Sequence, residues 1–169
     1  MTRQTTPDDA AEFTLDVSIG AQMKRTQRIM LRSLQLRLAP HGVPIGMWFF
    51  LRALWEEDGL SQREISDRVG TTAATAVEQL RNMEASGMVV RRPSEADRRK
   101  VHFFLTPRAH ELRAELIALP QEVERIAVAG LTPGEVGFLR LAMMRIQDNL
   151  ASADAQPPGA ETLLPDDED

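Results

Sequence analysis

The sequence predicts a mainly α-helical protein with one small β-hairpin, and three observations lead to this fold class. Apolar residues recur at helical spacing in several long segments, helix-start signals precede the shorter segments, and two short β-like runs flank a turn-rich stretch. With 169 residues, of which 43% are hydrophobic, the chain is long enough for one domain with a substantial core.

The first two predicted helices differ in how much of their surface is apolar. In residues 16–39 the apolar side chains fall within roughly 120° of one another at about 100° per residue. These side chains are Ile19, Met23, Met30, Leu31, Leu34 and Leu38. This amphipathic helix ends at APHGVP, where Pro and Gly break the pattern. The next segment, IGMWFFLRALWEED (45–58), is apolar almost all round and predicts a largely buried helix that Gly59 ends.

Two short helices follow, joined by a tight glycine turn. Ser61 as N-cap and Glu64 at the third helical position form the capping-box pattern that begins the first of them. Thr71 or Thr72 caps the second, AATAVEQLRNMEAS (73–86), whose apolar positions repeat at three and four residues. The pair therefore has the form of a helix-turn-helix.

A β-hairpin with a basic tip is predicted between residues 88 and 106. Two β-like runs, MVVRR and KVHFFLT, flank the turn-rich PSEAD. Arg98, Arg99 and Lys100 follow this turn directly, although the whole chain has a formal net charge of -5. A basic hairpin alone is usually a solvated loop, but this one follows two capped helices of the right lengths.

Two long helices are predicted after the hairpin. Thr106 and Pro107 begin the first, which Pro120 interrupts or kinks. TPGE, at 132–135, begins the second, which reaches Asn149.

Residues 151–169 have the composition of a disordered acidic tail. They contain Pro and Gly but no Lys or Arg, and their acidic residues are Asp154, Glu161, Asp166, Asp167, Glu168 and Asp169. The whole chain has 25 acidic and 20 basic residues. When these six acidic residues are left out, 19 acidic residues remain against 20 basic ones, so the formal net charge of residues 1–150 is +1. The acidic net charge is therefore no argument against a DNA partner.

The capped helix pair and the basic hairpin together make a winged helix-turn-helix. The second helix can enter the major groove with its N-terminus, where short hydroxyl side chains approach phosphates and base edges. The hairpin tip can lie over the minor groove, where arginines meet strongly negative potential. We expect DNA contacts from Ser61, Thr71, Thr72, Thr75, Arg81, Asp97, Arg98, Arg99 and Lys100. For Asp97 we favour a structural role, in which it orients a nearby arginine and contacts no base.

The sequence resembles the MarR family of winged-helix transcription regulators over residues 16–149. Asp97, Arg99, Leu105 and Thr106 match the family's wing pattern. LSQREISDRVG and LRNMEASGMVVRR match its helix-turn-helix, and GLTPGEVGFLRLAMMRIQDNL looks like its C-terminal dimerisation helix. The resemblance implies an obligate homodimer with interlaced N- and C-terminal helices, which binds a pseudo-palindromic operator and releases it when a small molecule binds.

The resemblance also implies a division of the chain. The parts are an N-terminal arm (1–15), dimerisation helices (16–40 and 107–150), a winged helix-turn-helix region (41–106) and the acidic tail (151–169).

The chain departs from the family pattern in the recognition helix. Val77 and Glu78 stand where the family usually has Thr-Arg, Arg81-Asn82 replaces a later Asp-Arg pair, and Ala109 replaces a Gly after the wing. A glutamate that faces DNA repels phosphate unless it accepts a hydrogen bond from a cytosine amino group. Either the operator differs from the common type or Glu78 points away from DNA.

A cationic arc on the first helix is the candidate effector site. Lys24, Arg25, Arg28 and Arg32 lie within about 100° of one another. They form either a solvated face with operator-flanking phosphate contacts, or an anion-binding wall over an apolar floor that includes Trp48 and Phe49. The resemblance implies a pocket between the dimerisation and DNA-binding regions, with an aromatic acid or its CoA thioester as the expected effector.

Other classes of protein have little support. The chain has no Cys or Tyr for nucleophilic or phenolic chemistry, no glycine-rich phosphate loop and no Ser-His-carboxylate spacing, so we expect no enzyme. His41, His102 and His110 lack metal-ligand spacing, and we expect neither metal nor cofactor. Without an apolar run of membrane-spanning length or a signal-peptide core, a cytoplasmic protein with no membrane partner is expected.

The leading prediction is a ligand-responsive, homodimeric DNA-binding regulator that acts as a repressor. The alternative is a winged-helix protein-interaction module without specific DNA binding. Glu78 and the acidic tail favour the alternative, whereas the Arg98-Arg99-Lys100 sequence favours DNA.

Overall fold

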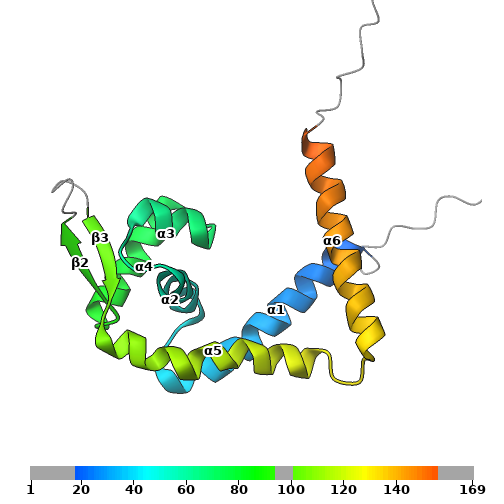
Figure 1. The fold of residues 1–169 in the computed structure, drawn as a ribbon, viewed down its shortest axis with the longest axis horizontal. Coiled ribbons are helices and arrows are strands. Elements are labelled where there is room, and N and C mark those ends of the chain that lie inside the picture. Colours follow the sequence, from blue (N-terminus) through cyan, green and yellow to red (C-terminus); the bar gives the residue numbers. More distant parts are fainter. Residues whose placement is uncertain (1–17, 94–100, 156–169) are drawn as a thin grey trace, which may run out of the picture. The chain divides into compact units, whose positions relative to one another are not determined.

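The computed structural model describes residues 18–93 and 101–155 of a chain that divides into two compact units, residues 1–127 and 128–169 (Figure 1). The elements of the first unit are α1 (Ile19–Leu38), the short 3-10 helix η1 (Ala39–His41), α2 (Ile45–Glu56), β1 (Leu60–Ser61), α3 (Gln62–Val69), α4 (Ala73–Ala85), β2 (Val89–Pro93), β3 (Val101–Leu105) and α5 (Pro107–Ala127). The second unit contains α6 (Pro133–Ala155). The mainly helical winged helix-turn-helix predicted from the sequence is confirmed.

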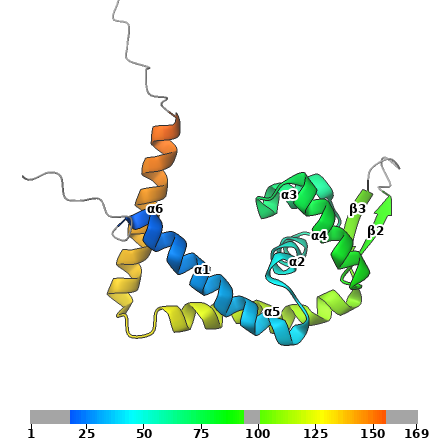
Figure 2. The same cartoon turned by 180° about the vertical axis from the view of Figure 1, so that it is seen from behind.

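Helix α1 is buried only near its C-terminal end. Its N-cap is Ser18, and its buried side chains are Leu34 and Leu38. It packs against α5 (Figure 2), where Arg37 Nη2 lies 3.2 Å from Glu122 Oε1. The N-terminal half of α1, by contrast, adds no buried residue to the core of the first unit.

Helix α2 is the centre of the core, as its apolar sequence predicts. Its buried residues are Met47, Trp48, Phe50, Leu51, Ala53, Leu54 and Trp55. Burying each large apolar side chain stabilises the fold by about 1.5–3 kcal/mol. Around α2 pack buried residues of α3, α4, the sheet and α5, among them Ile65, Leu80, Phe103 and Leu116.

The turn between α3 and α4 is fixed by local hydrogen bonds. Gly70 adopts φ +71, which suits a residue without Cβ. Ser66 is buried, and its Oγ donates to the Thr71 carbonyl at 2.8 Å. Of the two candidate caps for α4, the structure assigns Thr72, whose Oγ1 accepts from the Thr75 N–H at 3.2 Å.

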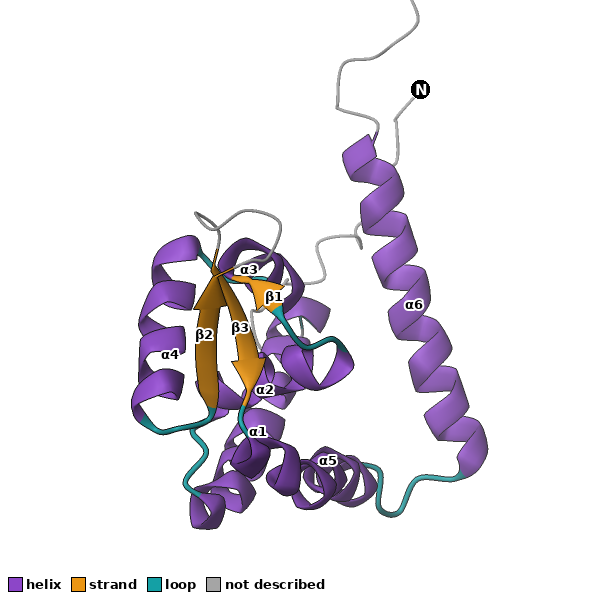
Figure 3. Ribbon diagram, turned by 60° about the vertical axis from the view of Figure 1, so that its left-hand side comes forward, coloured by secondary structure: helices purple, strands orange, loops and turns teal. Residues whose placement is uncertain are grey.

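The wing is a three-stranded antiparallel sheet with the order β1-β3-β2 (Figure 3). The predicted hairpin is confirmed in β2 and β3, with Val89 opposite Leu105 and Arg92 opposite His102. The two-residue strand β1 was not predicted. It pairs Leu60 with Phe103 and thereby joins the start of α3 to the wing.

Two predicted boundaries are wrong. Pro120 was predicted to interrupt or kink helix α5, and the interruption is wrong, because residues 107–127 form one helix in which Leu116 and Val123 are buried on either side of the proline. The loss of one backbone donor is therefore tolerated. The predicted tail began at residue 151, but α6 continues to Ala155. The rest of that segment, like the N-terminal arm, lies outside the described residues. Within the described ranges, no helix is long and apolar enough to cross a membrane.

The capping box of α3 makes a testable contribution to pH-dependent stability. The Ser61 N–H donates to Glu64 Oε2 at 2.7 Å, and the Glu64 N–H donates to Ser61 Oγ at 3.3 Å. Hydrogen bonding of the Glu64 carboxylate to the Ser61 side chain, and then to the Ser61 backbone N–H, lowers the pKa of Glu64 below its ordinary 4.5. A lowered pKa in the folded state stabilises the fold above the unfolded-state pKa, and this contribution is lost as the pH falls through 4.5 and below.

We therefore expect Glu64→Gln to reduce the loss of stability between pH 6 and pH 3, measured by urea unfolding. Ser61→Ala should cost about 1 kcal/mol at pH 7. The control is Glu111→Gln on the exposed surface of α5, which should retain the wild-type pH dependence. An unchanged pH dependence in Glu64→Gln would contradict the prediction.

Candidate nucleic-acid interface

The outer face of α4 presents most of the predicted groove-binding residues. The inner face of α4 is formed by Ala76, Leu80 and Met83, which are buried, and its outer face by Thr72, Thr75 and Arg81, which are exposed. The Oγ1 atoms of Thr72 and Thr75 lie 2.9 Å apart at the start of the helix. Both hydroxyls therefore stand at the N-terminus of the helix, where the helix dipole favours phosphate oxygens.

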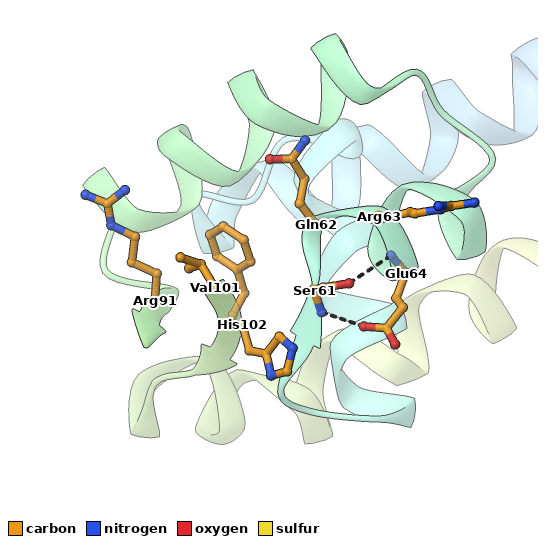
Figure 4. Close-up of a pocket in the computed structure, with 8 residues that line it drawn as sticks. Ser61, Gln62, Arg63, Glu64, Arg91, Val101 and His102 are labelled. Carbon is orange, nitrogen blue, oxygen red and sulfur yellow. Dashed lines mark hydrogen bonds between the residues drawn. The ribbon is translucent and has the colours of Figure 1, made fainter. Parts of the chain in front are cut away.

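Two other predicted residues are already engaged in local structure. Thr71 is half-buried and its carbonyl accepts from Ser66 Oγ. Ser61 belongs to the capping box, and it also lines an open pocket between the start of α3 and the wing (Figure 4). The other residues of this pocket are Gln62, Arg63, Glu64, Arg91, Val101, His102 and Phe103.

The base of the wing carries two arginines that were not predicted as site residues. Arg91 Nε lies 3.4 Å from Glu84 Oε1 and so connects β2 to α4. The Arg92 guanidinium lies over the Phe104 ring, 5.2 Å from its centroid. Both arginines belong to the predicted β-like run MVVRR, and consecutive side chains of a strand point to opposite faces of the sheet. Their partners, Glu84 and Phe104, could not be predicted from that run alone. The predicted wing-tip residues Asp97, Arg98, Arg99 and Lys100 lie outside the described residues.

The end of α4 is held by the start of α5. Thr106 donates through Oγ1 to the Gly87 carbonyl at 2.7 Å and through its N–H to the Met88 carbonyl at 3.0 Å. Arg108 Nη1 donates to the Ser86 carbonyl at 3.2 Å. A displacement of the first turn of α5 would therefore be transmitted to the C-terminal end of α4.

In the described part of the chain, the predicted cationic residues of the effector site and its predicted aromatic floor do not line the same pocket. Lys24, Arg25 and Arg28 line an open groove along α1, and Arg32 is also exposed on that helix. The predicted apolar floor lies elsewhere, on α2. The amphipathic pattern identified which faces are exposed, but it could not show which helix lies opposite them.

A different pocket, between α2 and α5, combines aromatic and cationic side chains. Its lining residues are Trp48, Arg52, Trp55, Glu56, Arg113, Ile117, Pro120 and Gln121. Phe49 is half-buried and lines another pocket, with Arg52 and Arg68.

The two tryptophans form the apolar wall of the α2–α5 pocket. Their rings meet edge to face with centroids 5.7 Å apart, and Trp55 Nε1 donates to the Ala109 carbonyl at 3.0 Å. At the rim, Arg52 Nε lies 3.7 Å from Glu56 Oε1, whereas Arg113 has no ion pair with any described residue. Sequence reasoning missed Arg113, because it lies on α5, far along the chain from the aromatic residues of α2. Among the described residues, no cluster of His, Asp or Glu could hold a metal ion.

Comparison with known proteins agrees with this architecture. The family model described as the MarR family matches residues 45–101. The HTH-type transcriptional regulator TtmR of Methylorubrum extorquens (strain PA1) is 36% identical over 121 residues, which are 72% of this chain and 57% of TtmR. The chain thus spans little more than half the length of that relative.

Solved structures share the fold. A MarR family transcriptional regulator from Listeria monocytogenes, complexed with 26mer DNA, has a TM-score of 0.68 at 18% identity, covering 80% of this chain and 90% of that one. CouR from Rhodococcus jostii RHA1, bound to p-coumaroyl-CoA, has a TM-score of 0.67 at 23% identity, covering 79% and 94%. From the helix-turn-helix, the wing, the family match and TtmR together, the chain belongs to the MarR family.

Proposed function

We propose that the protein is a homodimeric transcriptional regulator, a repressor, that binds a pseudo-palindromic DNA operator. The observation that carries this proposal is the exposed N-terminal turn of α4, where Thr72 and Thr75 stand free of the core beside a wing of basic sequence. This geometry suits a helix N-terminus in the major groove and a wing over the adjacent minor groove. The relative from Listeria monocytogenes, which binds DNA, supports the same mode of action.

The composition of α6 supports a dimer. This helix of 23 residues has no buried residue within its unit. Its large apolar side chains are exposed instead, for example Phe138 at 75% and Leu141 at 66%. Apolar residues occur on several of its faces, and a helix of this kind requires a partner surface. A second copy of the chain, with the first and last helices interlaced, supplies that surface.

DNA binding is tested by fluorescence anisotropy with labelled DNA from the gene's own upstream region, against scrambled DNA, across a salt series. We expect preferential binding to the upstream DNA that weakens steeply with salt, since bound phosphates release counterions. Arg99→Ala should lower the affinity by about 1–3 kcal/mol. The matched control is Arg125→Ala on the exposed surface of α5, which should bind as the wild type does. A protein-interaction module would instead bind both DNAs equally weakly.

We further propose that the operator is released when a small anion, an aromatic acid or its CoA thioester, binds the α2–α5 pocket. Trp48 and Trp55 line this pocket with apolar ring atoms, and Arg113 at its rim has no ion pair with any described residue. This combination suits an aromatic ring with a carboxylate. The relative CouR, which binds p-coumaroyl-CoA, supports a ligand of this class.

Tryptophan fluorescence tests the effector site directly, because the chain has two tryptophans and both line this pocket. We expect saturable quenching by 4-hydroxybenzoate or its CoA thioester, and a loss of about tenfold in affinity for Arg113→Gln. Arg125→Gln is the charge-matched control. If Arg28→Gln weakens binding while Arg113→Gln does not, the anion lies in the α1 groove and the present assignment is wrong.

A further inference from the structure

We propose that Glu78 determines operator specificity by accepting a hydrogen bond from the amino group of a cytosine in the major groove. The inference rests on the proposed function, because it requires that α4 lies in that groove. It resolves the two alternatives left by the sequence, an unusual operator or a glutamate turned away from DNA, in favour of the unusual operator.

The first support is the position of Glu78 on α4. At about 100° per residue, Glu78 lies roughly opposite the side on which Ala76, Leu80 and Met83 are buried. It is exposed, and it occupies the middle of the outer face between Thr75 and Arg81. A helix that enters the groove with its outer face therefore directs this side chain at the base edges.

The second support is the shape of the surface around Glu78. Ala74, one turn before it, is exposed and has only a methyl side chain. Thr75 is also short and keeps its hydroxyl close to Thr72 at the start of the helix. The longer glutamate therefore extends beyond its N-terminal neighbours, and these small residues allow the helix to approach the bases closely.

The third support is that the Glu78 carboxylate has no partner among the described residues, unlike the other glutamates of the helix-turn-helix. Glu84, the second glutamate of α4, pairs with Arg91, and Glu64 is held by the capping box. Arg81 lies one turn away but makes no ion pair with Glu78. The carboxylate is thus available to accept from a ligand.

The chemistry of the groove then selects one base. Cytosine presents the N4 amino donor there, whereas guanine presents the acceptors N7 and O6 and thymine presents the acceptor O4. Adenine also presents a donor, N6, but the lone pair of its neighbouring acceptor N7 repels a carboxylate, so adenine is a poorer partner than cytosine. A carboxylate, which only accepts, is satisfied by cytosine and repelled by the lone pairs of guanine and thymine. Close to phosphates, an unsatisfied carboxylate is costly, so a wrong base is strongly disfavoured.

The test is in vitro selection from a random double-stranded DNA library, performed with the full chain as wild type, Glu78→Gln, Glu78→Ala and the charge-matched control Glu111→Gln. We expect the wild type and the control to select a motif with cytosine at one position of each half-site, by about tenfold or more over guanine or thymine. Glu78→Gln should change this preference to adenine, because a glutamine amide pairs with N6 and N7 of adenine. Glu78→Ala should lose the preference, and both variants should bind random DNA more tightly than the control.

The outcomes separate this inference from the proposed function. If all four proteins select the same base at every position, the inference is wrong while sequence-specific binding stands. If the wild type selects no motif, specific DNA binding itself is wrong, and the inference falls with it. Thermal melting of each variant, expected to match that of the wild type because Glu78 is exposed, establishes that the variants are folded.

Discussion

A variant with Phe138→Glu and Leu141→Glu is expected to be a monomer that binds operator DNA about a hundredfold more weakly than the wild type. The two side chains lie within about 60° of each other on α6, and both are largely exposed within their own unit. In the proposed dimer they would be covered by the second copy, where an unpaired carboxylate is strongly unfavourable. A monomer contacts one half-site and loses the effective concentration that a linked second domain supplies. Analytical ultracentrifugation and anisotropy measure the two effects.

The matched control places the same charges at polar positions of the same helix. Gln147 and Asn149 are exposed on α6, and Gln147→Glu with Asn149→Glu should leave the protein dimeric. If the Phe138 and Leu141 variant sediments as a dimer, the apolar surface of α6 serves another purpose. If it sediments as a monomer yet binds operator DNA as the wild type does, dimerisation is not needed for recognition.

The parts of the fold that the sequence predicted well are those decided by neighbouring residues. The Ser61 and Glu64 capping box and the threonine cap of α4, for which the sequence offered Thr71 or Thr72, are formed within one helical turn, so a local pattern is sufficient. The strand β1 was missed because two residues carry no pattern, and its pairing depends on Phe103, far along the chain. Pro120 was overestimated as a helix breaker because buried neighbours hold the helix together on both sides.

The candidate sites follow the same division. The exposed threonines of α4 were predicted from the helix start, whereas the α2–α5 pocket depends on a packing angle that brings Arg113 beside Trp48 and Trp55. Helical spacing showed that the cations of α1 share a face. The sequence near them, however, does not indicate which helix packs against that face. Their predicted partners Trp48 and Phe49 consequently line other pockets.

Trp55→Ala is expected to lower the free energy of unfolding by about 3–5 kcal/mol, because it removes a large buried ring and leaves a cavity. Trp55 is 7% exposed, packs edge to face on Trp48 and donates from Nε1 to the Ala109 carbonyl. Trp55→Phe keeps most of the ring and should cost about 1 kcal/mol for the hydrogen bond. Urea unfolding followed by circular dichroism, at one protein concentration since a dimer's stability depends on it, measures both. A cost below 1 kcal/mol for Trp55→Ala would show that α5 closes over the gap.

Trp55→Phe also tests how a ligand in the α2–α5 pocket reaches α4. Trp55 holds the first turn of α5 through Ala109, and at the start of the same helix Thr106 and Arg108 bind the carbonyls of Gly87 and Ser86, directly after α4. A ligand that displaces Trp55 therefore shifts the point to which α4 is attached. If this route carries the response, Trp55→Phe should bind 4-hydroxybenzoate and operator DNA each much as the wild type does, while the ligand loses most of its ability to release the DNA. Such a loss of coupling without loss of either affinity is the result that distinguishes a transmitted displacement from a merely weakened pocket. Full release in the variant would show that the signal passes through other contacts of α5.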